Sequence, residues 1–409
     1  MDCRIADEYR DTHAGRVAGE ILRKCVHCGF CTATCPTYQL LGDELDGPRG
    51  RIYLIKQVLE GQPVTAKTRL HLDRCLTCRS CESTCPSGVE YGHLLDIGRQ
   101  LVEDKLQRPL NEALPRALLK TVLPEPALFG PAVALGRALK PLLPSVLADK
   151  LPPAAADARP WPEKGRHSRR MLALAGCVQP SLAPNINAAT ARVLDRLGIE
   201  LFEEKKAGCC GAVRHHLNDQ AAARADMRRN IDACWPHVEA GVEAIVVTAS
   251  GCGVQVRDYG HLLADDADYA EKAARVSALC RDPSEVVAAE GGRLRAVLAP
   301  AERGKLAFQS PCTLQHGLKI RGVVENLLAA AGYLLTPVAD GHLCCGSAGT
   351  YSLLQPALSQ QLRANKLAAL TAGGAALIAT ANIGCLTHLQ AGATTPVRHW
   401  IELIDEALE

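Results

Sequence analysis

The sequence predicts an α+β protein, in which a mostly helical domain precedes two copies of an α/β domain. Two runs of four cysteines stand in the amino-terminal quarter of the 409 residues. From residue 169 onward, cysteine-bearing segments recur at nearly constant spacing, and short apolar runs alternate with helical patterns. We therefore expect four segments: the helical domain with the two cysteine runs at 1–105, a connector at 106–168, and two repeats at 169–300 and 301–409.

Each cysteine run has the spacing C-x2-C-x2-C-x3-C, and a proline (Pro36 or Pro86) follows its last cysteine. Bacterial ferredoxins hold cubane 4Fe-4S clusters with this pattern. Three cysteines two residues apart lie on a tight loop and turn their sulfurs toward one corner of a cube, while the proline forces an extended exit after the fourth. The runs thus resemble those of two-cluster ferredoxins and predict a ferredoxin-like domain.

In two-cluster ferredoxins the fourth cysteine of each run ligates the other cluster. By this resemblance we assign one cluster to Cys25, Cys28, Cys31 and Cys85, and the other to Cys75, Cys78, Cys81 and Cys35. Zinc is the alternative metal, but zinc sites use C-x2-C pairs with two further ligands a dozen or more residues away. The paired runs therefore favour iron–sulfur clusters over a zinc-binding scaffold.

The segment between the runs is expected to be helical, because its apolar positions (Ile52, Leu54, Ile55, Val58 and Leu59) recur at helical spacing. Three arginines lie close to the runs in sequence: Arg49, Arg51 and Arg79. They either offset the charge of the thiolates or are ordinary solvated side chains.

The connector is rich in proline, alanine and leucine, and we expect short helices broken by the prolines. This segment either packs on the protein's own domains or a partner, or lies on a membrane surface.

The two repeats carry matching cysteines. Cys177, Cys209 and Cys210 reappear 135 residues later as Cys312, Cys344 and Cys345, and Cys252 reappears 133 residues later as Cys385. Buried strands are expected at 171–175 and 244–248, and helices at 187–197 and 221–238. Because ligands gather at the carboxyl ends of parallel strands, we expect these cysteines to meet there, in two pockets or in one shared pocket.

Four thiols from three loops suit a metal cluster or a redox thiol site. Burial as apolar side chains is the alternative, and it explains Cys3, Cys234 and Cys280, which lie outside the repeated pattern. A glycine follows each cysteine pair (Gly211 and Gly346) and permits a turn or a close backbone approach.

Composition excludes several classes of function. The net charge of +2 and an aromatic content of 4% argue against a nucleic-acid-binding surface. No uncharged apolar stretch is long enough for a membrane span, and residues 1–20 lack the apolar core of a signal peptide, so we expect a cytoplasmic protein with reduced thiols. No G-x-G-x-x-G follows a strand, so substrate chemistry is expected elsewhere.

The repeated C-x31-CCG-x40-C and C-x31-CCG-x38-C patterns resemble the CCG domains of heterodisulfide reductase. That family ends each motif with C-x-x-C, whereas this chain has Gln255 and His388 at the last position, which puts a fifth cysteine ligand in doubt. The whole chain is similar to glycolate oxidase iron–sulfur subunits through CVHCGFCTATCPTYQLLGDELDGPRGRIYLIKQ (25–57), LDRCLTCRSCESTCPSG (72–88), AGCCGAV (207–213), PCTLQHG (311–317) and HLCCGSAGTYS (342–352).

This resemblance implies an electron-transfer subunit with two 4Fe-4S clusters, without catalytic residues of its own. Separate subunits would bind FAD and oxidise glycolate to glyoxylate, with D-lactate as a further substrate, and this chain would pass the electrons to an acceptor other than oxygen, a quinone. It also implies a peripheral place on the inner face of the cytoplasmic membrane. The alternatives are a subunit of a lactate or anaerobic glycerol-3-phosphate dehydrogenase, and a thiol–disulfide reductase that acts at the CCG cysteines.

Overall fold

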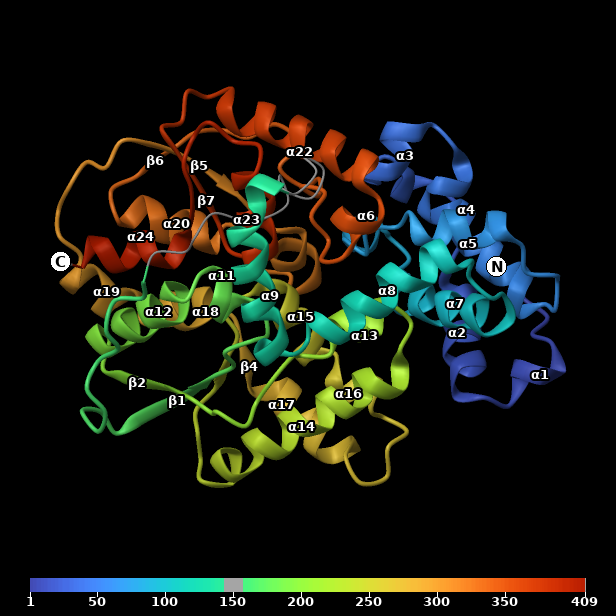
Figure 1. Cartoon of the computed structure of the whole chain (residues 1–409), viewed down its shortest axis with the longest axis horizontal. Helices are drawn as coiled ribbons and strands as arrows, with labels where there is room; N and C mark the ends of the chain where they lie inside the picture. The colour runs from blue at the N-terminus through green and yellow to red at the C-terminus, as the bar shows by residue number, and fades with distance from the viewer. Residues whose placement is uncertain (143–156, 409) are drawn as a thin grey trace.

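The computed structural model describes residues 1–142 and 157–408 of the chain. Three bodies lie together: a helical domain that holds both cysteine runs, and two α/β repeats (Figure 1). The predicted α+β class is confirmed, with small parallel sheets confined to the repeats.

The ferredoxin-like domain is built around α4 and α7, which pack on each other. Ile52, Ile55, Val58 and Leu59 of α4 are buried, so the helix predicted between the cysteine runs is confirmed. Leu94 and Leu95 of α7 complete this core. The α-helices of the domain are α1 (Asp7–Arg10), α2 (His13–Lys24), α3 (Pro36–Leu41), α4 (Pro48–Leu59), α5 (Ala66–Asp73), α6 (Ser80–Thr84) and α7 (Tyr91–Lys105).

The predicted connector forms two helices, α8 (Leu110–Val122) and α9 (Pro126–Ala138), that run along repeat 1 (Figure 1). Pro124 and Pro126 lie at the break between them, as expected, but Pro115 and Pro131 lie inside the helices. A proline inside a helix removes one backbone hydrogen bond, and here the surrounding turns keep the helix intact. Residues 143–156 of the predicted connector lie outside the described residues.

Within the described part of the chain, none of the helices taken singly has the length and apolar character to cross a membrane. The helices α8 and α9 pass that test only as a pair, and they are bent by 113° relative to each other.

Repeat 1 has a parallel sheet in the order β2-β1-β3-β4, with Leu172 paired to Ile245 and Met171 to Leu201. The strand expected at 244–248 is shorter than predicted. The elements are β1 (Arg169–Ala173), α11 (Gln179–Leu182), α12 (Asn185–Arg196), β2 (Ile199–Glu203), α13 (Ala212–His216), α14 (Gln220–Glu239), β3 (Ile245–Val246), α15 (Ser250–Arg257), α16 (Tyr259–Leu262), α17 (Ala270–Leu279), β4 (Cys280–Arg281), α18 (Pro283–Ala289) and α19 (Gly291–Val297).

Repeat 2 has the same sheet order, β6-β5-β7-β8, with Leu306 paired to Leu377. The duplication read from the cysteines is therefore matched by the topology. The elements are β5 (Lys305–Gln309), α20 (Val323–Ala330), β6 (Leu334–Leu335), α21 (Tyr351–Leu354), α22 (Pro356–Thr371), β7 (Leu377–Thr380), α23 (Ile383–Gln390), β8 (Val397–His399) and α24 (Trp400–Ala407), with a π-helical turn at Thr313–Gly317.

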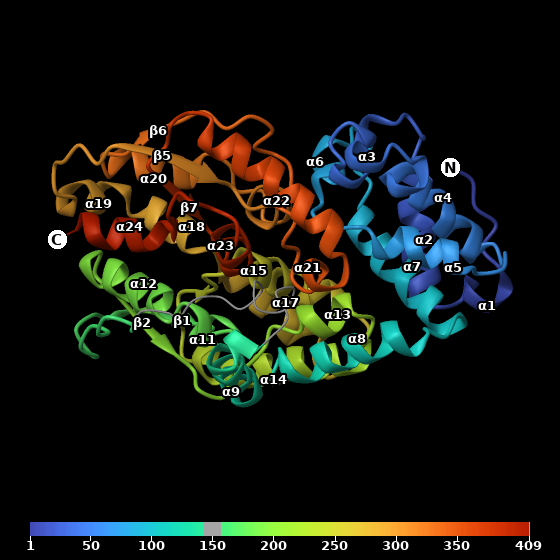
Figure 2. The same ribbon diagram turned by 45° about the horizontal axis from the view of Figure 1, so that its top comes forward.

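The ferredoxin-like domain contacts both repeats (Figure 2). Arg79 pairs with Asp258 of repeat 1 at 2.6 Å. On repeat 2, the imidazole of His316 lies 2.9 Å from the Ser83 hydroxyl, and α22 approaches α3. The loop that carries the second cysteine run is thus held between the two repeats.

Candidate metal centres

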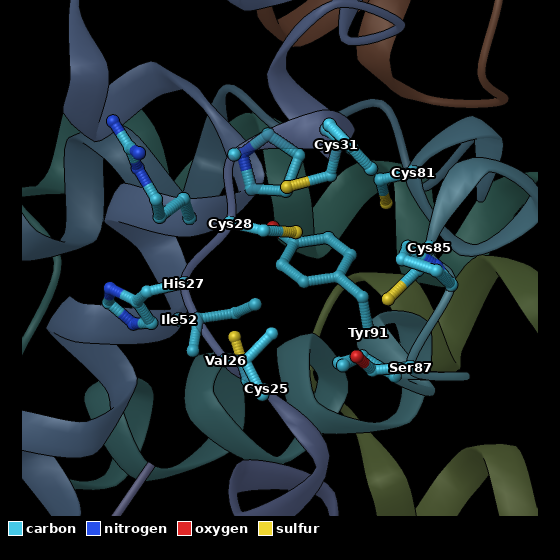
Figure 3. Close-up of a pocket in the computed structure, with 16 residues that line it drawn as sticks. Cys25, Val26, His27, Cys28, Cys31, Ile52, Cys81, Cys85, Ser87 and Tyr91 are labelled. Carbon is cyan, nitrogen blue, oxygen red and sulfur yellow. The ribbon is translucent and has the colours of Figure 1, made fainter.

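The four cysteines predicted for the first cluster line one cavity. Cys25, Cys28 and Cys31 come from the loop after α2, and Cys85 comes from the end of α6, in the second run. Figure 3 shows their sulfurs arranged around the ring of Tyr91. A cysteine of the second run therefore lies beside three cysteines of the first, while its role as a cluster ligand stays a prediction.

The four cysteines predicted for the second cluster line a neighbouring cavity, with Cys75, Cys78 and Cys81 from the second run and Cys35 from the first. Cys81 and the Tyr91 ring line both cavities. Two bound groups would be separated by little more than these side chains.

Both cysteine runs turn at residues with a positive φ angle. The φ angle is positive at His27 and Gly29 in the first run, at 57° and 85°, and at Thr77 and Arg79 in the second, at 54° and 58°. A residue other than glycine pays a steric cost in this left-handed region, and such strain gathers at functional sites. The alternation bends each loop so that successive cysteines face inward.

The donor set of the second cavity fits an iron–sulfur cluster. Its lining includes four thiols and the guanidinium groups of Arg51 and Arg79. Among the described residues, no carboxylate lines it. Soft thiolates suit iron–sulfur clusters, and the arginines balance the negative charge that four thiolates carry. Arg49 lines the first cavity in the same way, so all three arginines noted in the sequence lie beside the cysteines.

Arg51 is held by a buried polar network behind the second cavity. Its guanidinium donates to the carbonyl of His71 at 2.7 Å and lies 3.4 Å from the carboxylate of Asp46. Burial acts to lower the pKa of Arg51, but negative charge on Cys75, Cys35 and Asp46 outweighs it and raises the pKa. The cation is thus fixed where thiolates need compensation.

Two hydrogen bonds reach the sulfur of Cys75. The Thr77 backbone N–H donates at 3.4 Å, and the Tyr91 hydroxyl donates at 3.6 Å. Burial and the neighbouring Cys75 thiolate raise the pKa of Tyr91, so its hydroxyl keeps the proton that it donates. Donors aimed at ligand sulfurs tune the reduction potential of a cluster.

The two cavities differ in exposure. Cys28 of the first is exposed, and its neighbours Val26 and Phe30 are 69% and 61% exposed. Cys35 and Cys75 of the second are buried. The first cavity therefore faces solvent through an apolar rim, whereas the cysteines of the second are less exposed, with Cys81 also buried and Cys78 half-buried.

The cysteines of repeat 1 contact one another at the carboxyl end of its sheet. Cys177 follows β1, Cys209 and Cys210 precede α13, and Cys252 lies in α15 after β3. Hydrogen bonds from Cys177 and Cys210 lower the pKa of Cys209, and the same bonds raise the pKa values of their donors. Gly211, at a φ of 86°, provides the turn after the pair.

The cysteines of repeat 2 form a corresponding group, all of them buried. The sulfurs of Cys312 and Cys344 are 3.8 Å apart, and those of Cys345 and Cys385 are 3.3 Å apart. A side chain on Gly346 would lie 2.6 Å from a backbone oxygen, which explains the glycine. Of the two arrangements that the sequence left open, the structure has one group of thiols in each repeat.

In the described ranges 1–142 and 157–408, it is the repeat 2 group that packs against the second cluster cavity. Cys312 and Cys344 form one apolar cluster with Leu76, and Cys78 lies against it. Negative charge on Cys78 contributes to raising the pKa of Cys344, after the effects of hydrogen bonds, burial and Cys345. The sequence held no signal for this contact, because it depends on how separate domains dock.

The positions where related motifs carry a further cysteine are occupied differently. Gln255 is buried, and the His388 imidazole lies 3.3 Å from the Ser359 hydroxyl. Cys234 and Cys280 are buried in the core of repeat 1, as expected for cysteines outside the pattern, while Cys3 is partly exposed.

Comparison with known proteins identifies both parts of the chain. The 4Fe-4S dicluster domain family matches residues 21–89, and the cysteine-rich domain family matches residues 171–257 and 306–390.

The chain is similar to two proteins over most or all of its length, and to a third over about half. The chain is 57% identical to the glycolate oxidase iron-sulfur subunit of Escherichia coli (strain K12) over 409 residues, which cover 100% of both proteins. It is 31% identical to a probable glycolate oxidase iron-sulfur subunit of Bacillus subtilis (strain 168), over 91% of this chain and 89% of that protein. Lactate utilization protein A of the same organism is 26% identical over 52% of this chain and 87% of its own length. The chain therefore belongs to the family of glycolate oxidase iron–sulfur subunits.

Proposed function

We propose that this chain is the electron-transfer subunit of a glycolate-oxidising complex. Partner subunits that bind FAD oxidise glycolate to glyoxylate, and D-lactate as a second substrate, and this chain delivers the electrons to a quinone. The observation that carries the proposal is the pair of adjoining cysteine-lined cavities, which share Cys81 and Tyr91. A 4Fe-4S cluster bound in each accepts and releases one electron at a time, which suits reoxidation of a flavin in single steps.

The proposed ligands are those assigned from the sequence. Cys25, Cys28, Cys31 and Cys85 hold the first cluster, and Cys75, Cys78, Cys81 and Cys35 hold the second. Their support is the lining of the two cavities and the arginines beside them. The proposed division of labour follows the predicted segments, with the clusters in 1–105, the connector in 106–168 and the repeats in 169–300 and 301–409.

Electrons are proposed to enter at the first cluster. Its ligand Cys28 is exposed and is flanked by Val26 and Phe30, two large apolar side chains that stand in solvent. An exposed apolar rim around a redox site fits the docking of a partner subunit. The second cluster, whose cysteines are less exposed, is then the next carrier of the electrons.

The CCG cysteines are proposed to hold a further iron–sulfur or other metal centre in each repeat. The convergence of four thiols per repeat supports this, and Cys312 and Cys344 lie beside the second cavity. A peripheral position on the inner face of the cytoplasmic membrane is part of the proposal. Its support is the outward apolar side chains of α8, where Leu110 and Leu114 are 85% and 72% exposed.

Iron and sulfide analysis with EPR of the anaerobically purified chain tests the cluster assignment. Cys25→Ser is expected to remove the signal of one cubane cluster and about half of the cubane iron. Cys3→Ser, at a cysteine outside both cavities, serves as the control and is expected to keep both signals. Unchanged iron and spectra in Cys25→Ser would refute the ligand assignment, and zinc without iron would favour a scaffold.

The substrate is tested with the co-purified flavin subunits. Glycolate is expected to bleach the iron–sulfur absorbance of the complex, and a complex that responds only to lactate or glycerol 3-phosphate would instead support one of the other dehydrogenases. Turnover of a disulfide by the chain without flavin subunits would support the thiol–disulfide reductase.

A further inference from the structure

Repeat 2 contains a cavity of about 330 Å³ that none of the proposed cluster ligands lines. It lies at the carboxyl end of β5, where Phe308 and Gln309 form part of its wall, and it is also lined by residues of β6, α20 and α22. This volume is within the range of about 300–1,000 Å³ for small-molecule sites.

Two cations face this cavity without a carboxylate partner. Lys366 of α22 is only 4% exposed, and its ammonium group donates to the backbone carbonyl of Asp340 at 2.8 Å. Arg321 stands at the exposed mouth and donates through Nε to the carbonyl of Gln315 at 3.1 Å. Across the described residues, no acidic side chain lies within 4.0 Å of either cation, although Glu325 also lines the cavity.

A buried ammonium without a counter-ion is costly, because the interior solvates charge poorly. Burial lowers the pKa of Lys366, and negative charge on Cys345, Cys344 and the more distant Asp340 carboxylate opposes that effect. Lys366 thus lines the cavity while it also interacts with the repeat 2 thiols. A ligand with negative or electron-rich oxygens would supply the missing partner.

The cavity adjoins the repeat 2 cysteines through shared loops. Gln315 lies three residues after Cys312, and His342 lies two residues before Cys344, and both side chains line the cavity. Cys312 and Cys344 in turn pack with Cys78 on the other side. The repeat 2 thiols therefore contact the second cluster cavity and are joined to this cavity by the loops that carry Gln315 and His342.

Repeat 1 replaces the cations of this cavity by apolar residues. At the 135-residue offset that relates the cysteine pairs, Arg321 corresponds to Ile186, which is fully buried. Lys366 corresponds to Ile231, or to Ala233 at the 133-residue offset of the last cysteines, and both are buried. The cations are thus specific to the repeat that contacts the second cluster cavity.

We propose that the repeat 2 cavity binds the terminal electron acceptor, a compact cyclic dicarbonyl compound of the quinone class, with its oxygens toward Lys366 and Arg321. The inference rests on the proposed function as an electron carrier. Phe308, Leu335 and Val338 supply an apolar wall for the ring, and Gln309 and Gln315 add amides at the rim. A small carboxylate would use the same cations, but it would leave the apolar wall unused.

The reaction at this site balances simply. The acceptor takes two electrons, delivered one at a time from this chain, and two protons from water at the open mouth, and becomes the dihydroxy form. Lys366 and Arg321 stabilise the negative charge that grows on the carbonyl oxygens as the electrons arrive. The electrons originate in the hydroxy acid oxidised on the flavin subunit.

Equilibrium binding of menadione to the oxidised, cluster-containing chain tests the site by calorimetry, with glycolate and acetate as competing arms. Lys366→Met and Arg321→Gln are each expected to weaken menadione binding by about 10- to 100-fold, because each removes a charged hydrogen-bond donor. Lys305→Met makes the same charge change at the opposite end of β5 and is expected to leave binding unchanged. Iron content and melting temperature verify that each variant is folded and loaded.

Reoxidation of the dithionite-reduced chain by menadione provides a second readout, and it should slow in Lys366→Met but not in Lys305→Met. Unchanged menadione binding in both cavity variants would overturn the inference, as would binding of glycolate or acetate, but not of menadione, that depends on Lys366. A chain that accepts electrons from its flavin partner yet does not bind menadione would refute this site alone. A chain without iron would instead refute the proposed function.

Discussion

Replacing Tyr91 with phenylalanine tests whether the hydroxyl that donates to Cys75 tunes the second cluster. Tyr91 is 4% exposed and its hydroxyl lies 3.6 Å from the Cys75 sulfur. Phenylalanine keeps the ring that both cavities share, so the change removes the donor with little loss of packing. The hydrogen bond stabilises the more negative, reduced state more than the oxidised state, so its loss should lower the reduction potential of this cluster.

The expected size follows from the geometry. A hydrogen bond to a charged group contributes about 1.5–3 kcal/mol, and a long bond to sulfur changes by only part of this between two oxidation states, about 0.5–1 kcal/mol. For a one-electron couple this corresponds to a fall of about 20–40 mV. Cys75 keeps its bond from the Thr77 backbone, so the cluster itself should remain bound.

EPR-monitored redox titration of the anaerobically purified chain measures both clusters separately. Tyr53→Phe is the matched control, because Tyr53 is 46% exposed on α4 and lines neither cavity. An unchanged or raised potential in Tyr91→Phe, with full iron content, would refute the assignment of Cys75 to a cluster that Tyr91 tunes. A shift of equal size in Tyr53→Phe would show that the effect is not specific.

Three further predictions concern docking, packing and pH. Phe30→Ser should weaken co-purification of the flavin subunits by roughly 10- to 100-fold while both cluster signals remain, whereas Leu334→Ser, which is equally exposed at 61%, should not. Gly346→Ala should lower the free energy of unfolding by at least about 2 kcal/mol, because Gly346 has a φ of 90° and an added Cβ would lie 2.6 Å from a backbone oxygen. Gly349→Ala is the control: it also has a positive φ but open space around it, and it should cost only about 1 kcal/mol. Equal costs in thermal unfolding would contradict the packing argument. Burial lowers the pKa of His399 to about 3, so the unfolded chain takes up a proton that the folded chain does not, and stability should fall by about 2 kcal/mol between about pH 7 and about pH 5. His399→Asn, which keeps an oxygen acceptor at the start of α24, should remove most of that loss in melting curves, and an unchanged pH dependence would exclude His399 as its source.

Local spacing predicted the parts of the site that depend on one loop. The resemblance to two-cluster ferredoxins named the cysteines that line each cavity, and their role as cluster ligands stays a prediction. The helical spacing of the apolar residues in α4 likewise predicted that helix. Nothing near Tyr91 marks it as a donor to sulfur, because its partner Cys75 lies on another element and the contact depends on how α7 packs.

Contacts between elements that are distant in the sequence could not be predicted from it. Lys366 has the pattern of one more basic residue on an amphipathic helix, and only the folded repeat 2 brings it near the thiols of that repeat. The contact of Cys78 with the cluster that holds Cys344 depends in addition on how two domains dock. The prolines at 115 and 131 were predicted to break helices, but each costs only part of the local hydrogen bonding, and the flanking turns continue α8 and α9 past each ring.

The inequality of the two repeats gives the proposed electron path a direction. Duplication alone would produce two thiol groups with equal access to the clusters. Instead, the repeat 2 group packs on Cys78 and adjoins a cavity with a buried cation, whereas repeat 1 has apolar side chains at the corresponding positions. Because electron transfer weakens steeply with distance, electrons that enter beside the exposed Cys28 should leave through repeat 2. A Cys209→Ser variant in repeat 1 should then retain most menadione reduction that Cys344→Ser abolishes, and equal losses in the two variants would contradict this path.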